Sequence, residues 1–129
     1  MQGIKQIILI RRDLRMRRGK EIAQGAHAAM AFLREKIHCP SLQNECQIVL
    51  STLEQTWIFQ GMAKICLQVH SEVELKKRHQ QAIDAGLQSH LIIDSGRTEF
   101  AGNATVTACA IGPDLADKID IICGDLKLY

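Results

Sequence analysis

Residues 11–20 are the part of this chain best suited to hold an anion. They carry six positive charges and one negative charge, although the whole chain of 129 residues has a formal net charge of only +2. The segment follows the apolar run Ile7–Ile10 and precedes a helical pattern that begins near Lys20. A helix N-terminus supplies free N–H groups and the positive end of the helix dipole, so we predict that this segment binds a polyanion.

Two polar clusters later in the chain could carry chemistry. Asp94 and Gly96 follow the apolar run 90–93, and Thr105 and Thr107 lie two residues apart in another strand-like run, where both would face one side. Each cluster also has an ordinary explanation. Aspartate and glycine are typical of turns, and threonine is common in strands. His27, on a small-residue helix face, is by itself more typical of a packed residue than of a catalytic base.

The elements that position these residues alternate between strands and helices. Expected strands are 4–11, 63–69, 90–93 and 105–111, and expected helices are 19–37, 41–60, 71–86 and a last short one starting at Pro113. Ser41 would cap the second helix. The order β-α-α-β-α-β-β-α predicts an α/β fold, a three-layer α/β/α single domain over residues 1–129 with a small mixed sheet.

Composition excludes several classes of protein. No apolar run approaches the roughly 20 residues that span a bilayer, and the first residues do not resemble a secretory signal. The five cysteines are odd in number and widely spaced, so we expect a reduced, cytoplasmic protein without disulfides. His38, Cys39 and Cys46 lack the spacing of a zinc site, and we expect no metal.

Together these pieces resemble the type 2 peptidyl-tRNA hydrolases. The resemblance is carried by Lys20-x-x-x-Gln24-x-x-His27-Ala28, Asp94-x-Gly96-x-Thr98-Glu99, Thr105-x-Thr107, Gly112-Pro113 and Leu126-Lys127-Leu128, in order along nearly the whole chain. It implies a compact, commonly dimeric α/β/α enzyme that cleaves the ester between a peptide and tRNA without a metal or organic cofactor. The partners expected are therefore peptidyl-tRNA and a second copy of the chain, with no membrane.

The resemblance also assigns the site residues. The catalytic set is Lys20, Asp94, Thr98 and Thr107, and the substrate-binding and tRNA-binding set is Arg11, Arg12, Arg15, Arg17, Arg18, Gln24, His27, Arg97 and Thr105. Ester hydrolysis needs an oriented water and a donor to the developing oxyanion. Asp94 would orient the water, with its pKa raised by burial, and Lys20 would hold a phosphate or the oxyanion. No serine or cysteine is obviously paired with a histidine, so we expect no covalent nucleophile.

The segment Phe100–Ala104 departs from the family, whose members usually have Pro-Gly before the Thr-x-Thr pair. We expect this longer loop to affect the choice of substrate, with Phe100 either stacking on the terminal adenine or packing inward.

An apolar stripe at helical spacing is either core or a dimer surface; it consists of Leu50, Leu53, Trp57 and Ile58. Two alternatives stay open: a non-catalytic RNA- or protein-binding module with this fold, and a domain that binds a phosphorylated metabolite.

Overall fold

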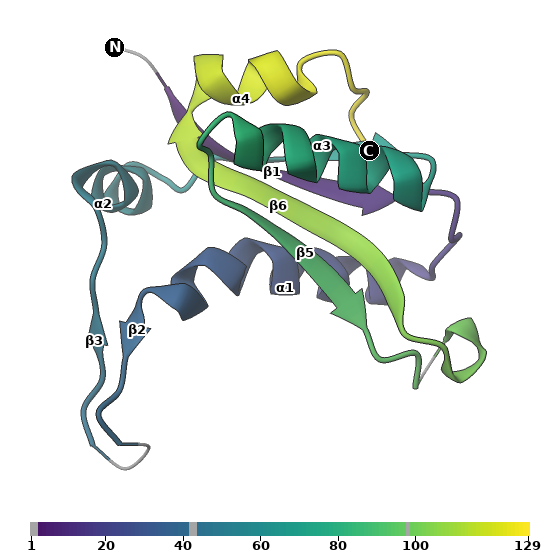
Figure 1. Cartoon of the computed structure of the whole chain (residues 1–129), viewed down its shortest axis with the longest axis horizontal. Coiled ribbons are helices and arrows are strands. Elements are labelled where there is room, and N and C mark those ends of the chain that lie inside the picture. The colour runs from purple at the N-terminus through teal and green to yellow at the C-terminus, as the bar shows by residue number, and fades with distance from the viewer. Residues whose placement is uncertain (1–2, 42–43, 98) are drawn as a thin grey trace.

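The computed structural model describes residues 3–41, 44–97 and 99–129, and Thr98 lies outside them. Its centre is a four-stranded sheet in the order β4-β1-β6-β5 (Figure 1). The strands are β1 (Ile4–Arg11), β4 (Lys64–Val69), β5 (Ser89–Asp94) and β6 (Thr105–Leu115). Strand β1 is parallel to β4 and antiparallel to β6, and β5 is antiparallel to β6. The sheet is therefore mixed, as predicted.

Helices cover both faces of this sheet. The long helix α1 (Arg18–Glu35) lies on one face, and α3 (Glu72–Asp84) and α4 (Ala116–Cys123) lie on the other (Figure 1). Alternation along β1 divides the core accordingly. Ile8 packs in the cluster that contains Ala28 of α1, whereas Ile7 packs in the cluster that contains Leu75 of α3. The three-layer α/β/α prediction is confirmed. None of the helices in the described ranges has the length and apolarity needed to cross a membrane.

The predicted second helix begins about ten residues too early. A short hairpin of β2 (Ile37–His38) and β3 (Gln47–Ile48) comes first, and α2 spans only Thr52–Phe59. The true cap is Ser51. Its side chain accepts from the Glu54 N–H and the Glu54 carboxylate accepts from the Ser51 N–H, each within 3.1 Å. This reciprocal pair satisfies two of the helix's free N–H groups, which explains why the helix begins there.

The expectation of no disulfide is wrong. The hairpin, which projects away from the sheet in Figure 1, brings the Cα atoms of Cys39 and Cys46 to 4.5 Å, and the two residues form a disulfide. The remaining cysteines are free, and Cys66, expected in an apolar environment, is exposed. The hairpin was not recognised in the sequence, so the proximity of two cysteines seven residues apart was not recognised either.

The predicted start of the last helix is also wrong. Strand β6 continues through Gly112 and Pro113 to Leu115, and α4 begins at Ala116. Pairing with β1 shifts at this point: Ile7 is opposite Ile111, whereas Lys5 is opposite Asp114. Pro113 therefore lies in a bulge, one of the places in a sheet where a residue without an N–H is tolerated.

The two edges of the sheet differ. At the β4 edge, Leu128 bridges to Leu67, and the N–H groups of Gln68 and Tyr129 donate to the carbonyls of Lys127 and Cys66, both at 3.0 Å. At the opposite edge, β5 pairs with β6 and with no other strand among the described residues. The C-terminal residues therefore cover one edge and leave the other open.

Trp57 of the predicted apolar stripe belongs to the core, so we expect its truncation to destabilise the fold. It is 3% exposed, stacks edge-to-face on Phe32 and donates from Nε1 to the Ala63 carbonyl at 2.9 Å. Trp57→Ala should lower the free energy of unfolding by about 3–5 kcal/mol in urea denaturation. Ile121→Ala, on α4 and 84% exposed, is the control and should change it by less than about 0.5 kcal/mol. Equal effects of the two changes would contradict this account of α2.

Candidate functional site

An ion pair between Lys20 and Asp94 forms the centre of the candidate site. Lys20 lies in the first turn of α1 and Asp94 is the last residue of β5, and their Nζ and Oδ1 atoms are 2.7 Å apart. The two side chains are only 14% and 12% exposed. Both charges are thus largely removed from water, which requires close compensation, and the remaining exposure lets a small group reach them.

Two buried polar side chains support this pair from behind. Gln24, one helical turn after Lys20, donates from Nε2 to Asp94 Oδ1 at 3.3 Å, and its Oε1 accepts a short hydrogen bond from the hydroxyl of Thr107. Gln24 and Thr107 are both buried. Because the hydroxyl occupies the amide oxygen, the amide nitrogen faces the carboxylate. Thr107 therefore acts on the site through Gln24, not by direct contact with a substrate.

A bulge in β6 makes this support possible. Ile92 pairs with Ala108 and Ile93 pairs with Val106, which leaves Thr107 as an extra residue. Val106 packs with the α3 side of the core and Ala108 with the α1 side. Alternation from Ala108 would turn Thr107 toward α3, but the extra residue lets Thr107 and Ala108 face the same side of the sheet, and Thr107 reaches Gln24 on α1.

The loop after β5 holds the other oxygen of Asp94. The Gly96 N–H donates to Oδ2 at 2.8 Å, the turn that the sequence predicted. Gly96 has φ +82, and a Cβ there would lie 2.2 Å from the Asn103 carbonyl oxygen, so only glycine fits. The loop folds back so that the Phe100 ring lies 5.9 Å from Lys20 Nζ and packs against the core beneath α1. Of the alternatives for Phe100, the structure shows inward packing.

The expected direction of the Asp94 pKa shift is wrong. The hydrogen bond from Lys20 lowers the pKa of Asp94 below its ordinary value, although burial acts in the opposite direction. The Gly96 N–H and the charges of Lys20 and His27 lower the pKa further. The expectation considered the burial of Asp94 but not its ion pair with Lys20. Asp94 therefore remains a carboxylate at neutral pH, better suited to orient a water than to remove its proton unaided.

The arginines of the basic segment differ in availability. Arg11 binds both oxygens of Asp13, at 3.1 and 2.7 Å, and donates to the Val106 carbonyl at 2.9 Å, so it connects β1 to the loop. Arg17 pairs with Glu99 at 3.3 Å but stays 86% exposed. Arg12 lies over the Tyr129 ring at 5.6 Å. Three further exposed arginines form no ion pair with any residue within the described ranges: Arg15, Arg18 and Arg97.

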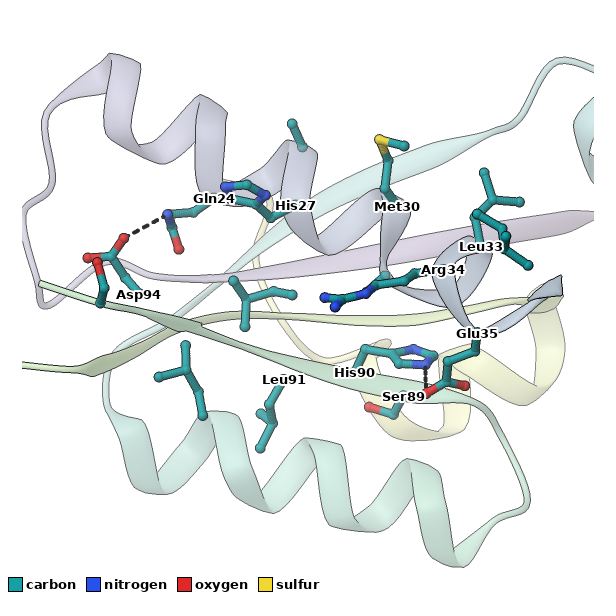
Figure 2. A pocket seen from close by; sticks show the side chains of 16 residues that line it. Gln24, His27, Met30, Leu33, Arg34, Glu35, Ser89, His90, Leu91 and Asp94 are labelled. Atoms are coloured by element: carbon teal, nitrogen blue, oxygen red, sulfur yellow. Dashed lines mark hydrogen bonds and ion pairs between the residues drawn. The ribbon is translucent and has the colours of Figure 1, made fainter. Parts of the chain in front are cut away.

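A groove of about 1330 Å³ leads away from Asp94 between α1 and β5. Figure 2 shows Gln24 and Asp94 at one end and the ion pair of Glu35 with His90 at the other. His27, for which the residue type alone favoured packing and the resemblance substrate binding, is exposed and lines the groove. The small-residue face of α1 that contains His27 is open to solvent, and α1 buries Gln24, Ala28 and Phe32.

The structure contains a serine, a cysteine and a histidine in contact, which sequence reasoning did not anticipate. His79 Nδ1 lies 2.6 Å from Ser89 Oγ, which lies 3.2 Å from Cys109 Sγ. Burial raises the pKa of Cys109 to about 11, and the thiol is completely inaccessible. This cluster therefore belongs to the core and does not supply a nucleophile. Within the described residues no group of three or more His, Cys, Asp or Glu side chains could hold a metal ion.

The structure thus brings Lys20, Gln24 and Asp94 together directly and Thr107 indirectly. Thr105, counted among the binding residues, donates to the Asn103 carbonyl at 2.9 Å and shapes the loop. Thr98, predicted to be catalytic, lies outside the described residues.

Comparison with known proteins places this arrangement in context. The family model described as "Peptidyl-tRNA hydrolase PTH2" matches residues 4–129. A peptidyl-tRNA hydrolase of Methanocaldococcus jannaschii is 39% identical, with 97% of this chain and 99% of that protein covered. One of Aeropyrum pernix is 36% identical, with 99% and 98% covered. Peptidyl-tRNA hydrolase 2 of Saccharomyces cerevisiae is 35% identical over 98% of this chain and 58% of its own length.

A solved structure shows the same fold at lower sequence similarity. A protein of unknown function from Agrobacterium tumefaciens superposes with a TM-score of 0.58 at 18% identity, covering 100% of this chain and 99% of that one. At this identity the likeness concerns the arrangement of the elements alone.

The ion pair predicts a measurable effect of Lys20 on the Asp94 pKa. Lys20→Met removes the main cause of the lowered pKa while burial persists, so the Asp94 pKa should rise, as followed by ¹³C NMR of the carboxyl carbon. In the native protein this carboxylate adds stability above its ordinary pKa of about 3.9, and that stability is lost as pH falls through the lowered value. Lys118→Met on α4 should leave the titration unchanged. An Asp94 pKa that does not move in Lys20→Met would exclude the pair as its cause.

Proposed function

The chain belongs to the peptidyl-tRNA hydrolase PTH2 family, and we propose that its Lys20–Asp94 pair is the centre that cleaves peptidyl-tRNA. The reaction is hydrolysis of the ester between the peptide's terminal carbonyl and the tRNA ribose, which releases a peptide and free tRNA. The observation that carries the assignment is the 2.7 Å contact of two largely buried opposite charges, placed where a basic segment meets a groove. We further propose that residues 1–129 act as one catalytic domain.

In this mechanism Asp94 orients water and Lys20 stabilises negative charge. Oδ1 of Asp94 is occupied by Lys20 and Gln24, whereas Oδ2 accepts from Gly96 and retains a lone pair for a water O–H. When the water oxygen attacks the ester carbonyl, the Lys20 ammonium stabilises the oxyanion. The intermediate collapses with cleavage of the bond to the ribose oxygen, and that oxygen takes up the proton that the water loses.

Gln24 and Thr107 are positioning residues in this proposal. Thr107 is fully buried and Gln24 is only 3% exposed, so their effect on the reaction passes mainly through the orientation of the Asp94 carboxylate. Thr98 is retained as a catalytic candidate on the resemblance alone. His27 lies on the groove side of the site and is retained as a substrate-binding residue.

The exposed arginines are proposed to hold tRNA phosphates. These arginines lie at the Lys20–Asp94 end of the molecule: Arg12, Arg15 and Arg17 in the loop between β1 and α1, Arg18 at the start of α1, and Arg97 in the loop after β5. Arg11 is removed from this set because Asp13 and the Val106 carbonyl occupy its guanidinium. A loop that reads phosphates by charge positions the RNA without reading its bases.

The alternatives are not favoured. A non-catalytic binding module does not require a compensated carboxylate at the open end of a groove, and full-length relatives carry the hydrolase name. A metabolite site would leave the exposed arginines without a role.

We propose in addition a cytoplasmic location, consistent with a substrate from translation, and a homodimer. Since Trp57 is buried, the exposed Phe59 and Met62 are the apolar side chains that this region offers a partner.

Replacement of the carboxylate tests the catalytic assignment. Asp94→Asn keeps the shape but removes the charge that orients water and holds Lys20, so turnover of N-acetyl-aminoacyl-tRNA should fall by about 10²-fold or more. Affinity for uncharged tRNA, measured by filter binding, should not weaken. The control is Asp117→Asn, at an exposed position of α4. Turnover by Asp94→Asn within about threefold of the native rate would remove Asp94 from the mechanism.

Salt dependence tests the tRNA surface. Each lost phosphate contact reduces the slope of log affinity against log salt by about one, so Arg15→Ala/Arg18→Ala should reduce it by up to about two. Lys77→Ala/Lys118→Ala removes the same charge from exposed positions on α3 and α4, on the other face of the sheet, and should leave the slope unchanged. Equal slopes for the arginine variant and the native protein would place these arginines outside the RNA contact.

A further inference from the structure

The groove between α1 and β5 has one wall made of exposed strand edge. Its lining includes every residue from Ser89 to Ser95 without a gap. Side chains alternate between the two faces of a strand, so a cavity lined by consecutive residues must run along the strand's side, where the backbone is accessible. This is the open edge of the sheet, because β5 pairs only with β6 in the described part of the chain.

The opposite wall, on α1, is apolar in its middle part and polar at its ends, with Gln24 and His27 near Asp94 and Arg34 and Glu35 at the far end. Met30 of α1 is 63% exposed and lines the groove together with Ala31 and Leu33. On the strand side, Ile93 is 64% exposed and Leu91 is partly buried. Figure 2 shows Met30 and Arg34 on the helix above the strand, with Leu91 below. Unpaired N–H and C=O groups beside apolar side chains are the features by which proteins bind an extended peptide as an added strand.

We propose that this groove binds the peptide part of peptidyl-tRNA as a strand added to β5, an inference that rests on the proposed function. The groove and the site share Gln24 and Asp94, so a peptide in the groove has one end at the carboxylate. The basic segment lies at that same end, before the start of α1. The ester that joins RNA to peptide is thereby placed between a cationic surface, which suits the RNA phosphates, and the groove, which suits the peptide.

The position of the site also determines the direction of the peptide. The peptide's C-terminal carbonyl carries the ester and must lie at Asp94, the C-terminal end of β5. The chain then extends back toward Ser89, which makes it parallel to β5. From Asp94 to Ser89 a strand covers roughly 17 Å, enough for about five extended residues. The Glu35–His90 ion pair, with 3.0 Å between its atoms, marks the far end.

Backbone pairing explains how one groove accepts peptides of any sequence. Main-chain hydrogen bonds provide affinity without reading side chains, and only the alternate side chains that face Met30 and its neighbours would modulate it. A free amino acid ester offers no backbone amide to the edge. The groove therefore favours peptidyl-tRNA over aminoacyl-tRNA by length alone.

The test compares two substrates with the same esterified residue, N-acetyl-aminoacyl-tRNA and hexapeptidyl-tRNA. The native protein should cleave the hexapeptidyl substrate with a kcat/KM at least about tenfold higher, the gain expected from one or two net backbone hydrogen bonds and some apolar burial. Met30→Asp should abolish this advantage. It should change kcat/KM for the N-acetyl substrate by less than about twofold, because Met30 lies about 15 Å along α1 from Lys20. The matched control is Ile121→Asp, 84% exposed on α4, which should preserve the ratio.

A hexapeptidyl-tRNA whose peptide amides are N-methylated provides the second arm, because it keeps the side chains but cannot donate to the strand edge. It should be cleaved no faster than the N-acetyl substrate. A ratio unchanged by Met30→Asp, or an N-methylated peptide cleaved as well as the native one, would overturn the groove assignment and leave the proposed function intact. If Met30→Asp leaves the ratio of the two kcat/KM values unchanged but lowers the sedimentation mass below that of the native protein, the groove is instead the contact with a second copy of the chain. Absence of turnover on both substrates would overturn the proposed function and the groove assignment with it.

Discussion

The compensation of one largely buried pair of charges governs the architecture of the site. An ammonium and a carboxylate that are mostly removed from water are stable only when their geometry is good and their other hydrogen-bonding groups are satisfied. Asp94 meets this condition with a lysine and an amide on one oxygen and a backbone N–H on the other. These donors come from two local features, a helix and a glycine turn. Lys20 and Gln24 lie one turn apart on a helix, and the backbone donor requires a glycine with positive φ.

The bulge in β6 connects this local geometry to the sheet. Because of the extra residue, Thr107 faces α1 on the same side as its neighbour Ala108, and its hydroxyl orients the amide of Gln24. The bulge therefore links the register of the central strand to the orientation of a carboxylate on the neighbouring strand. A buried amide has two ends that differ chemically, and the threonine determines which end faces the charge.

The sequence predicted the layers, most element boundaries and the end-of-element positions of Lys20 and Asp94, because periodicity and turn residues are local signals. It did not predict features that depend on distant partners. The pKa of Asp94 moves opposite to the expectation because Lys20, 74 residues away, outweighs burial. The hairpin disulfide was missed because Ser41 resembled a helix cap, although the reciprocal capping pair lies at Ser51 and Glu54. The residue type of His27 alone favoured packing, whereas His27 is exposed, because spacing defines a helix face and not its surroundings.

The different treatment of the two sheet edges limits how copies of this chain can associate. Residues 127–129 occupy the β4 edge at Cys66 and Gln68, so within the described residues β5 is the only strand of the four-stranded sheet whose outer edge is free. Growth of a fibril by strand addition needs two free edges on every molecule, one to accept and one to extend. A chain with a single free edge can join one other chain through that edge, and the assembly then ends. The C-terminal residues that cover the β4 edge therefore make pairing of the four-stranded sheet between copies self-terminating.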